Sequence, residues 1–390
     1  MNYLMVDISG RCPNYDIALC EAMHKEMQQN DYIKLLALNI NPKEIACDSS
    51  KLISFIPKKF QKIRNKPMLA IKAFNTLVNY CFLIVWLFQN NVDICHLQWL
   101  PFLEKNSVEK FFLKFLHIIS PKTRFFLTVH NIYPHDCSEK NKGAYKKRFT
   151  LVGSYFDKFI VHLNTSKLEF CSDFNIDEKR VEVIPHGVFV PKNLNVIPHK
   201  LGKKINLIMF GNQSYYKGTD VLVDSLAMLP KEYKSKVHTL VVGKTSPEYL
   251  AELREKKKDS DIEFIPVHVP DDALYKYIMD SDVIVVPYRE ISQSGVLLLA
   301  LSFKRMIIAS DLPSFKETLT GFSDDMFFEN GNAKSLAQLM KKYVDGKLDC
   351  NLPLQAINTL IRKYSWENVA NMYRFLAYDN KDVSTESLSA

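Results

Sequence analysis

The stretch LIMFGNQSYYKGTD, from Leu207 to Asp220, joins an apolar run to the first turn of a helical pattern. The apolar run predicts a strand that ends at Gly211, and Thr219 begins the helix. A helix start offers free backbone N–H groups and the positive end of the helix dipole. Gly218 lets the backbone approach a ligand, and Lys217 adds a full positive charge. The loop therefore predicts a phosphate or diphosphate site, and a surface turn with a solvated lysine is the alternative.

A second loop has the same plan. In DVIVVPYREISQSGVLLLALSF, residues 282–303, an apolar strand is followed by a polar loop and an apolar helix. Ser292, Ser294 and Gly295 lie at the start of that helix, where hydroxyl and N–H groups suit an anion. A serine that only caps the helix is the alternative. Two such helix starts on one sheet edge predict that a nucleoside diphosphate binds there.

Similar alternation of strands and helices runs along most of the chain. The predicted strands are 3–7, 34–38, 94–96, 124–129, 158–161, 182–184, 205–210, 239–242, 262–265, 283–286 and 306–309. Alternating strands and crossover helices imply parallel sheets covered on both faces. The polar, proline-bearing segment 185–204 interrupts the pattern. We therefore expect an α/β protein with two doubly wound, Rossmann-like domains facing each other across a cleft, at residues 1–190 and 205–365, joined by a linker at 191–204.

Composition limits the class of protein. Of the 390 residues, 47% are hydrophobic and 24% are charged, which is ordinary for a soluble globular protein. The N-terminus lacks the pattern of a secretory signal. The longest uninterrupted apolar run, Cys81–Phe88, is shorter than the roughly 18 to 20 residues that span a bilayer. Eight cysteines without a C-x-x-C pair indicate reduced thiols, and so a cytoplasmic location.

The net charge of +8 is concentrated partly in the segment 51–72. Its basic side chains, Lys58 to Arg64 among them, alternate with apolar ones, a composition that suits the inner face of a cell membrane. A solvated basic loop is the alternative. The sequence contains no recognised nucleic-acid-binding motif, so we expect no nucleic acid partner.

Several segments together resemble a known family. They are IPHGV (184–188), FGNQSYYKG (210–218), DVIVVPY (282–288), SGVLLLAL (294–301), IIASDLPSFKE (307–317), HLQW (96–99), TVHNIYPHD (128–136) and YSWENVANMYRFL (364–376). The series resembles glycosyltransferases of the GT-B fold, family four, and is most similar to bacterial enzymes of capsular polysaccharide and exopolysaccharide biosynthesis.

This resemblance implies a hexosyltransferase that moves a sugar from a nucleoside-diphosphate donor to a lipid-linked glycan. It also implies that the enzyme retains the anomeric configuration and needs no bound metal or other cofactor. The helix at 366–378 would cross back to the first domain, and 379–390 would be a disordered tail.

The resemblance also assigns residues to the donor site. Lys217 matches the family lysine on the diphosphate, and Gly10 falls in the first-domain loop that faces the donor. The predicted donor set is Gly10, Gly211, Asn212, Lys217, Gly218, Tyr288, Glu290, Ser292, Ser294 and Gly295. Two positions depart from the family. Asn212 replaces a common arginine, whose charge Arg289 or Arg11 would have to supply. The family's glutamate pair, expected near 291 and 299, is not intact.

Catalytic and acceptor candidates lie in the first domain. In HNIYPHD, His130 either hydrogen-bonds its loop or orients the transferred sugar, and Asp136 is the better base because an ionised carboxylate accepts a proton without pKa tuning. The loop does not suit a metal, since Pro134 excludes a helix that would align two histidines. The predicted catalytic set is His130, Asp136 and Lys217. The predicted acceptor set is Arg11, His96, Trp99 and His135, with Trp99 and Tyr133 as rings on which a sugar could stack.

Two other functional classes stay open. One is a nucleotide-sugar epimerase of the same fold, which would need no lipid-linked acceptor. The other is a non-catalytic scaffold that binds a sugar or nucleotide, which the missing glutamates make conceivable. Lys217 and His130 favour the transferase.

Overall fold

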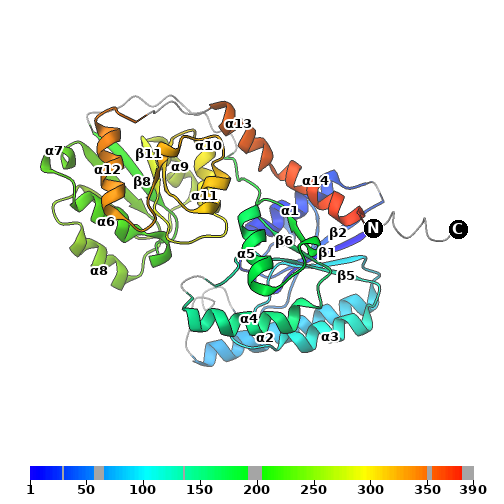
Figure 1. Cartoon of the computed structure of the whole chain (residues 1–390). Coiled ribbons are helices and arrows are strands. Elements are labelled where there is room, and N and C mark those ends of the chain that lie inside the picture. The colour runs from blue at the N-terminus through cyan, green and yellow to red at the C-terminus, as the bar shows by residue number, and fades with distance from the viewer. Residues whose placement is uncertain (29, 57–65, 135–136, 192–203, 349–353, 380–390) are drawn as a thin grey trace. The chain divides into compact units, whose positions relative to one another are not determined.

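The computed structural model describes residues 1–28, 30–56, 66–134, 137–191, 204–348 and 354–379. The chain divides into two compact units. The first comprises Met1–Gly187 with Ser365–Ala390, and the second is Val188–Tyr364. Each unit contains its own parallel sheet with helices on both faces (Figure 1).

The first unit contains a seven-stranded sheet in the order β3-β2-β1-β4-β5-β6-β7, and all neighbouring strands are parallel. The strands are β1 (Asn2–Asp7), β2 (Tyr32–Ala37), β3 (Asp48–Lys51), β4 (Ile94–Leu97), β5 (Arg124–Thr128), β6 (Lys158–Val161) and β7 (Val181–Val183). The helices are α1 (Pro13–Glu26), α2 (Lys66–Gln89), α3 (Glu109–Ile119), α4 (Glu139–Gly153), α5 (Asn164–Phe174) and α14 (Trp366–Tyr378).

The side chains of β1 show how this sheet is covered on both faces. Tyr3 and Met5 belong to a buried cluster with residues of α1 and α14. Leu4 and Val6 belong to another cluster, with residues of α2, α3, α4 and α5. Because successive side chains of a strand point to opposite faces, the two clusters lie on opposite sides of the sheet. α14 follows the second unit in the chain, yet it packs against α1 in the first.

The second unit contains a six-stranded sheet in the order β10-β9-β8-β11-β12-β13, also parallel throughout. Its strands are β8 (Ile205–Phe210), β9 (Val237–Val242), β10 (Ile262–Ile265), β11 (Val283–Val286), β12 (Met306–Ser310) and β13 (Phe327–Phe328). Its helices are α6 (Thr219–Ala227), α7 (Lys231–Lys234), α8 (Pro247–Lys256), α9 (Asp271–Met279), α10 (Gly295–Ser302), α11 (Pro313–Thr318), α12 (Ala333–Val344) and α13 (Leu354–Lys363).

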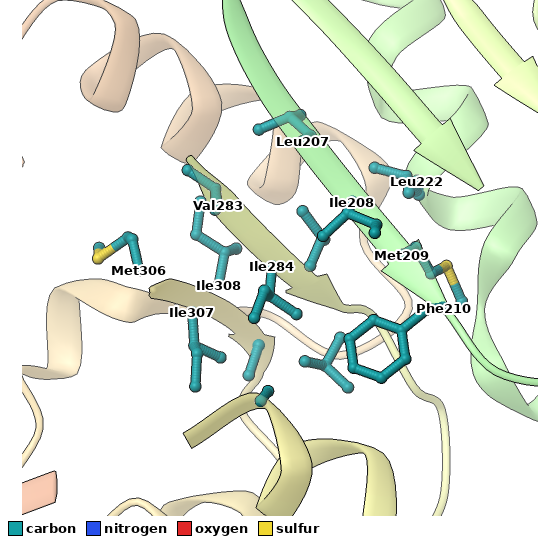
Figure 2. Close-up of a cluster of buried hydrophobic side chains, with 14 of the residues drawn as sticks. Leu207, Ile208, Met209, Phe210, Leu222, Val283, Ile284, Met306, Ile307 and Ile308 are labelled. Carbon is teal, nitrogen blue, oxygen red and sulfur yellow. The ribbon is translucent and has the colours of Figure 1, made fainter. Parts of the chain in front are cut away.

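The core of the second unit forms where its central strands meet. Side chains of β8, β11 and β12 interdigitate with Leu222 of α6 in one continuous buried cluster (Figure 2). These strands are apolar on both faces, as expected for a parallel sheet enclosed by helices. The doubly wound α/β prediction is therefore confirmed for both units. The prediction missed β3, whose sequence DSSK is polar, and β13, which has only two residues.

The strand order fixes where a ligand can bind. In each sheet the order reverses beside the first strand, between β1 and β4 in the first unit and between β8 and β11 in the second. Helices leave the sheet in opposite directions at such a point, so the loops after the two strands diverge and open a crevice. In the second unit, these loops are the two that the sequence singled out.

One helix of the first unit corrects a reading of the sequence. By length and composition, α2 is apolar enough to cross a membrane, with a mean hydropathy of 1.6 over its best window. The uninterrupted apolar run 81–88 is shorter than a membrane span, because polar residues, Asn75 and Asn79 among them, precede it. In the structure these two asparagines are buried, where Asn75 Oδ1 accepts from the Phe55 N–H (2.8 Å) and Asn79 Oδ1 from the Ile53 N–H (2.9 Å).

Candidate functional site

The loop between β8 and α6 depends on two glycines. Gly211 follows β8 and has a φ of +98°, and Gly218 precedes α6 with a φ of +67°, values that L-residues rarely adopt. A Cβ on Gly218 would lie 1.8 Å from the carbonyl oxygen of Pro287. Only glycine therefore lets this loop approach the loop after β11, which brings the two predicted donor loops together.

Lys217 is the central group of this loop. Lys217 is the last residue of a 3-10 turn, Tyr215–Lys217, and it is only 6% exposed. Its Nζ lies 5.0 Å from the centre of the Tyr288 ring, and a Cβ on Gly211 would lie 2.9 Å from the same atom. No described carboxylate forms an ion pair with it. Burial accordingly lowers the pKa of Lys217. A desolvated ammonium without a counter-ion is costly, so an anionic ligand would relieve this cost.

Two polar side chains that the sequence did not single out hold the loop in place. The Gln213 amide nitrogen donates to the Gly211 carbonyl (2.6 Å), and its oxygen accepts from the Thr219 hydroxyl (2.7 Å). Both residues are buried. A glutamine in a polar loop gives no sequence signal for this role, because its partners are defined only by the folded loop.

Arg289 does not supply the charge missing at Asn212. Its guanidinium donates twice to the Asp220 carboxylate, at 2.7 and 2.6 Å, and lies over the ring of Tyr215. Burial alone would raise the pKa of Asp220, but the hydrogen bonds and charge of Arg289 outweigh it and lower that pKa. This pair ties the start of α6 to the loop after β11. It leaves Lys217 as the cation of the two loops that has no ion-pair partner among the described residues.

The start of α10 is the second predicted anion site. The Ser294 hydroxyl accepts from the Leu297 N–H (3.1 Å), so its oxygen caps the helix. A Cβ added to Gly295 would meet nothing within 4 Å, whereas one on Gly211 would lie 3.2 Å from Val296 of α10. The first turn of α10 therefore borders the Lys217 loop. Gln293 directly precedes the cap residue Ser294. Both of its side-chain amide atoms are buried and lack a hydrogen-bond partner among the described residues.

The other predicted donor residues divide by exposure. Tyr288 is buried beneath Lys217, and burial raises the pKa of its hydroxyl, which keeps the ring neutral. Asn212 and Glu290 are exposed, and Ser292 is half-buried. Asn212 shares the loop of Lys217, and Glu290 and Ser292 lie in the loop after β11. A ligand bound at this sheet edge would lie near all three.

In the first unit, a cavity of about 630 Å³ opens beside β4 and β5. His130 stacks on Trp99 with ring centres 4.8 Å apart, and the Arg11 guanidinium lies 5.0 Å from the same Trp99 ring. All three line the cavity, together with Glu104 and Asn131. Arg11 pairs with Glu104 at 2.5 Å. Trp99 thus already contacts two of the other predicted site residues, His130 and Arg11.

His96 and Tyr133, also predicted near the acceptor, are not among the residues that line this cavity. His96 is fully buried, with its ring nitrogens 2.8 Å from the Tyr3 hydroxyl and 2.7 Å from the Thr128 hydroxyl. Burial lowers its pKa to about 3, so it is neutral. The Tyr133 hydroxyl donates to Asp173 (2.6 Å), which fixes that ring against its neighbours.

The loop after β1 is bordered by two buried carboxyl groups, and its cation, Arg11, is already paired with Glu104. Gly10, with a φ of +60°, donates its N–H to Asp7 Oδ1 (2.9 Å), as does Ser9 (2.9 Å). Asp16 of α1 is buried beside Asp7, and burial together with the charge of Asp7 raises the pKa of Asp16 well above its usual value. This loop does not resemble an anion site.

Some predicted residues lie outside the described part of the chain. These are His135, Asp136, the basic segment Lys58–Arg64, most of the predicted linker (192–203) and most of the predicted disordered tail (380–390). Among the described residues, no group of three or more His, Cys, Asp or Glu side chains is arranged to hold a metal ion.

One known protein family matches part of the chain. Residues 204–345 match the family model described as Glycosyl transferases group 1, and they lie inside the second unit. A comparison with the curated proteins found no match.

Solved structures of similar fold cover nearly the whole chain. A glycosyltransferase from Rickettsia africae has a TM-score of 0.69 at 18% identity, over 97% of this chain and 98% of that one. HepE from Anabaena, solved in complex with UDP and glucose, has a TM-score of 0.66 at 13% identity, over 96% and 98%. A sucrose-phosphate synthase from Thermosynechococcus elongatus has a TM-score of 0.67 at 14% identity, over 96% and 99%. The chain therefore has the GT-B fold of glycosyltransferases, and residues 204–345 in its second unit match the glycosyl transferases group 1 model.

Proposed function

We propose that this protein transfers a sugar from a nucleoside-diphosphate sugar to a hydroxyl of an acceptor glycan. The observation that carries the proposal is the buried ammonium of Lys217, which has no ion-pair partner among the described residues and lies at the switch point of the second sheet. Neutral ligands would leave this charge uncompensated. A diphosphate would pair with it and also accept from N–H groups at the starts of α6 and α10.

The chemistry follows from where charge develops. The bond between the anomeric carbon and the diphosphate oxygen breaks, and negative charge grows on the leaving diphosphate. Lys217 and the two helix starts are fixed before the reaction and stabilise that charge, which lowers the barrier to departure. The acceptor oxygen then bonds to the anomeric carbon, and its proton passes to an oxygen of the departing diphosphate, which leaves as the free nucleoside diphosphate. Retention of configuration, hexosyl transfer and independence of a metal are proposed from the family resemblance.

The cavity of the first unit supports an acceptor role. Its lining combines the Arg11–Glu104 pair, Asn131 and Tyr145 with apolar side chains. Hydrogen-bond donors and acceptors on an apolar wall suit a glycan, because a glycan presents hydroxyl groups and C–H faces together. We propose that the acceptor is a lipid-linked glycan of bacterial surface polysaccharide synthesis, reached from the cytoplasmic side of the membrane.

The outer face of α2 supports a membrane partner. Its exposed residues Ile71, Phe74, Cys81, Val85 and Phe88 follow helical spacing, and we refer to them as the α2 stripe. Phe74 is 59% and Phe88 77% exposed. A row of large apolar groups on one helix face is uncommon on a soluble protein and marks a contact surface.

The neighbouring helix α3 supports a lipid bilayer as the partner of this surface. It contacts α2 (Figure 1). Its exposed face alternates Lys110 and Lys114 with Phe111, Phe115 and Ile118. Apolar rings beside lysines match the boundary between acyl chains and anionic headgroups. We propose that the α2 stripe and this face of α3 contact the membrane.

Thermal unfolding tests the donor. The protein is heated with UDP, GDP, CMP and their sugars, with and without EDTA. We expect one nucleoside diphosphate to raise the Tm whether or not EDTA is present. No shift with any nucleotide would contradict the donor site. Product analysis then separates the classes, because an epimerase converts the sugar nucleotide without any acceptor, and a scaffold binds without turnover.

Co-sedimentation with vesicles tests the membrane surface. We expect binding to vesicles rich in phosphatidylglycerol and a loss of about tenfold in Phe88→Glu, since one exposed Phe contributes about 1.5–3 kcal/mol when buried. Leu168→Glu on α5, where the side chain is 64% exposed, is the control and should bind like the wild type. Absence of binding, with a dimer that Phe88→Glu disrupts, would show that a second copy covers this face instead.

A further inference from the structure

Four polar groups of the first unit form a chain of hydrogen bonds along the carboxyl edge of its sheet. They belong to Gln98 after β4, His130 after β5, His162 after β6 and Ile184 after β7. His130 lines the cavity, whereas His162 is 3% exposed and does not. His162 gave no functional signal in the sequence, because it follows a strand as many polar residues do.

The hydrogen-bond chain starts at the Ile184 carbonyl, which can act only as an acceptor. His162 Nδ1 lies 2.9 Å from the carbonyl oxygen of Ile184. A carbonyl oxygen only accepts, so Nδ1 must carry the hydrogen. Burial lowers the pKa of His162 to about 4, so the ring is neutral near pH 7. In a neutral imidazole one nitrogen donates and the other accepts, which makes His162 Nε2 an acceptor.

The same reasoning passes to His130. His162 Nε2 lies 3.2 Å from His130 Nδ1, so His130 Nδ1 must donate its hydrogen there. Burial, followed by the neighbouring His162, His186 and His96, lowers the pKa of His130 well below its usual value. A neutral His130 with its hydrogen on Nδ1 carries a lone pair on Nε2.

Gln98 completes the chain at the other nitrogen. His130 Nε2 lies 3.2 Å from the Gln98 side-chain amide, at the atom assigned as oxygen. Two lone pairs would repel at this distance, and the amide nitrogen and oxygen differ only by a rotation of the amide group. With the amide turned, its N–H donates to Nε2. Stacking on Trp99 keeps the His130 ring in this plane.

We infer that His162, anchored by the Ile184 carbonyl, is a positioning residue that fixes His130 in the Nδ1–H tautomer and leaves Nε2 as its hydrogen-bond acceptor. The inference deepens the proposed function and rests on it for one step, the assignment of His130 to the sugar site. With this tautomer, His130 Nε2 can accept a hydrogen bond from a sugar hydroxyl. That hydroxyl would take the place of the Gln98 amide, which occupies Nε2 in the structure. His130 does not donate to a sugar oxygen.

Histidine ring NMR tests the tautomer without any enzyme assay. Long-range ¹H–¹⁵N spectra of protein labelled with ¹⁵N-histidine are recorded at pH 7, and His130 is assigned from its loss in His130→Ala. We expect a protonated Nδ1 and an unprotonated Nε2 in the wild type. An Nε2–H tautomer or a doubly protonated ring would overturn the inference, whatever the protein's activity.

Two variants of similar size separate positioning from packing. His162→Gln can place an amide oxygen where Nε2 accepted from His130. His162→Asn is too short to reach His130 but can still donate to Ile184. We expect the Nδ1–H tautomer to survive in the Gln variant and to be lost, or mixed with the other form, in the Asn variant. An unchanged tautomer in both variants would overturn the inference.

Activity gives the second readout. In His162→Asn we expect kcat to fall about tenfold or more, with the KM for the donor nucleotide unchanged and activity largely restored in His162→Gln. Equal losses in both variants would contradict positioning through the tautomer and indicate packing alone. Failure of the proposed function would look different, because the wild type would then bind no nucleotide sugar while the NMR result stayed interpretable.

Discussion

The loops after β1 and β8 occupy the same topological position in the two sheets, yet their chemistry is opposite. Around β8, Lys217 is a buried cation without an ion-pair partner among the described residues. After β1, Arg11 is paired with Glu104, and the buried groups are the carboxyls of Asp7 and Asp16. One switch point is therefore electropositive and the other is not. The comparison supports our proposal that the second unit binds the phosphates of the donor and the first unit receives a hydroxyl-bearing ligand.

The strongest test of this difference is Lys217→Met. We expect kcat to fall on the order of 100-fold or more, as when one preorganised group on a developing negative charge is removed. Lys244→Met, an exposed lysine that follows β9, is the matched control and should keep full activity. Normal turnover of the Lys217 variant would contradict the role of this ammonium.

The same variant should not be less stable than the wild type. Because burial lowers the pKa of Lys217, the unfolded state binds the proton more tightly than the folded state. The wild type should therefore gain stability relative to Lys217→Met as the pH rises from the folded-state pKa toward 10.5. Urea unfolding of both proteins across that range measures the difference. A Met variant that is clearly less stable at pH 7 would mean that the ammonium has a stabilising partner.

Gly218→Ala tests whether the two loops of the second unit must touch. A Cβ there would meet the Pro287 carbonyl at 1.8 Å, so we expect a loss of at least about 2 kcal/mol in unfolding free energy and weak nucleotide binding. Gly346→Ala is the control, because Gly346 has a φ of +65° but open space around it. It should lose only the backbone term, about 1 kcal/mol. Equal losses would show that the contact with Pro287 is unimportant.

Arg289→Met tests the link between the loops more gently. We expect a loss of about 1 kcal/mol, since the pair with Asp220 is partly exposed. The lowered pKa of Asp220 means that this contribution is present above pH 3.8 and disappears as the pH falls through the folded-state pKa. Acid unfolding curves of wild type and variant should therefore converge at low pH. A difference that persists there would point to the Tyr215 stacking instead.

The smallest effect is expected in the first unit. Arg11→Met removes an exposed ion pair, which contributes less than about 0.5 kcal/mol to stability, and it should leave the affinity for a nucleoside diphosphate unchanged. Calorimetric titration measures that affinity. A loss as large as that of Lys217→Met would erase the distinction between the two switch points.

Much of this architecture could be predicted because it is local in the sequence. Apolar runs marked the strands from β4 to β12, and the order of strand, glycine, lysine and helix start located Lys217. The alternation of strands and helices then fixed the sheet edge to which both predicted loops belong.

The remainder depends on partners far apart in the chain. Arg289 looked available because Asp220, its partner, lies 69 residues away. Asn75 and Asn79 seemed to break an apolar run, but they face inward to bind the segment at 53–55 and leave the apolar side of α2 outside. The contacts of His162 with His130 and Ile184 exist only because the sheet brings the ends of β5, β6 and β7 together. Sequence patterns do not report such pairings, because the fold creates them.

The most direct measurement compares two ligands on two proteins. Calorimetric affinities of the preferred nucleoside diphosphate and of its nucleoside are measured for the wild type and for Lys217→Met. We predict that the variant binds the nucleoside as the wild type does and loses most of the extra affinity that the diphosphate confers. An equal loss for both ligands, or no loss for either, would contradict the assignment of Lys217 to the diphosphate.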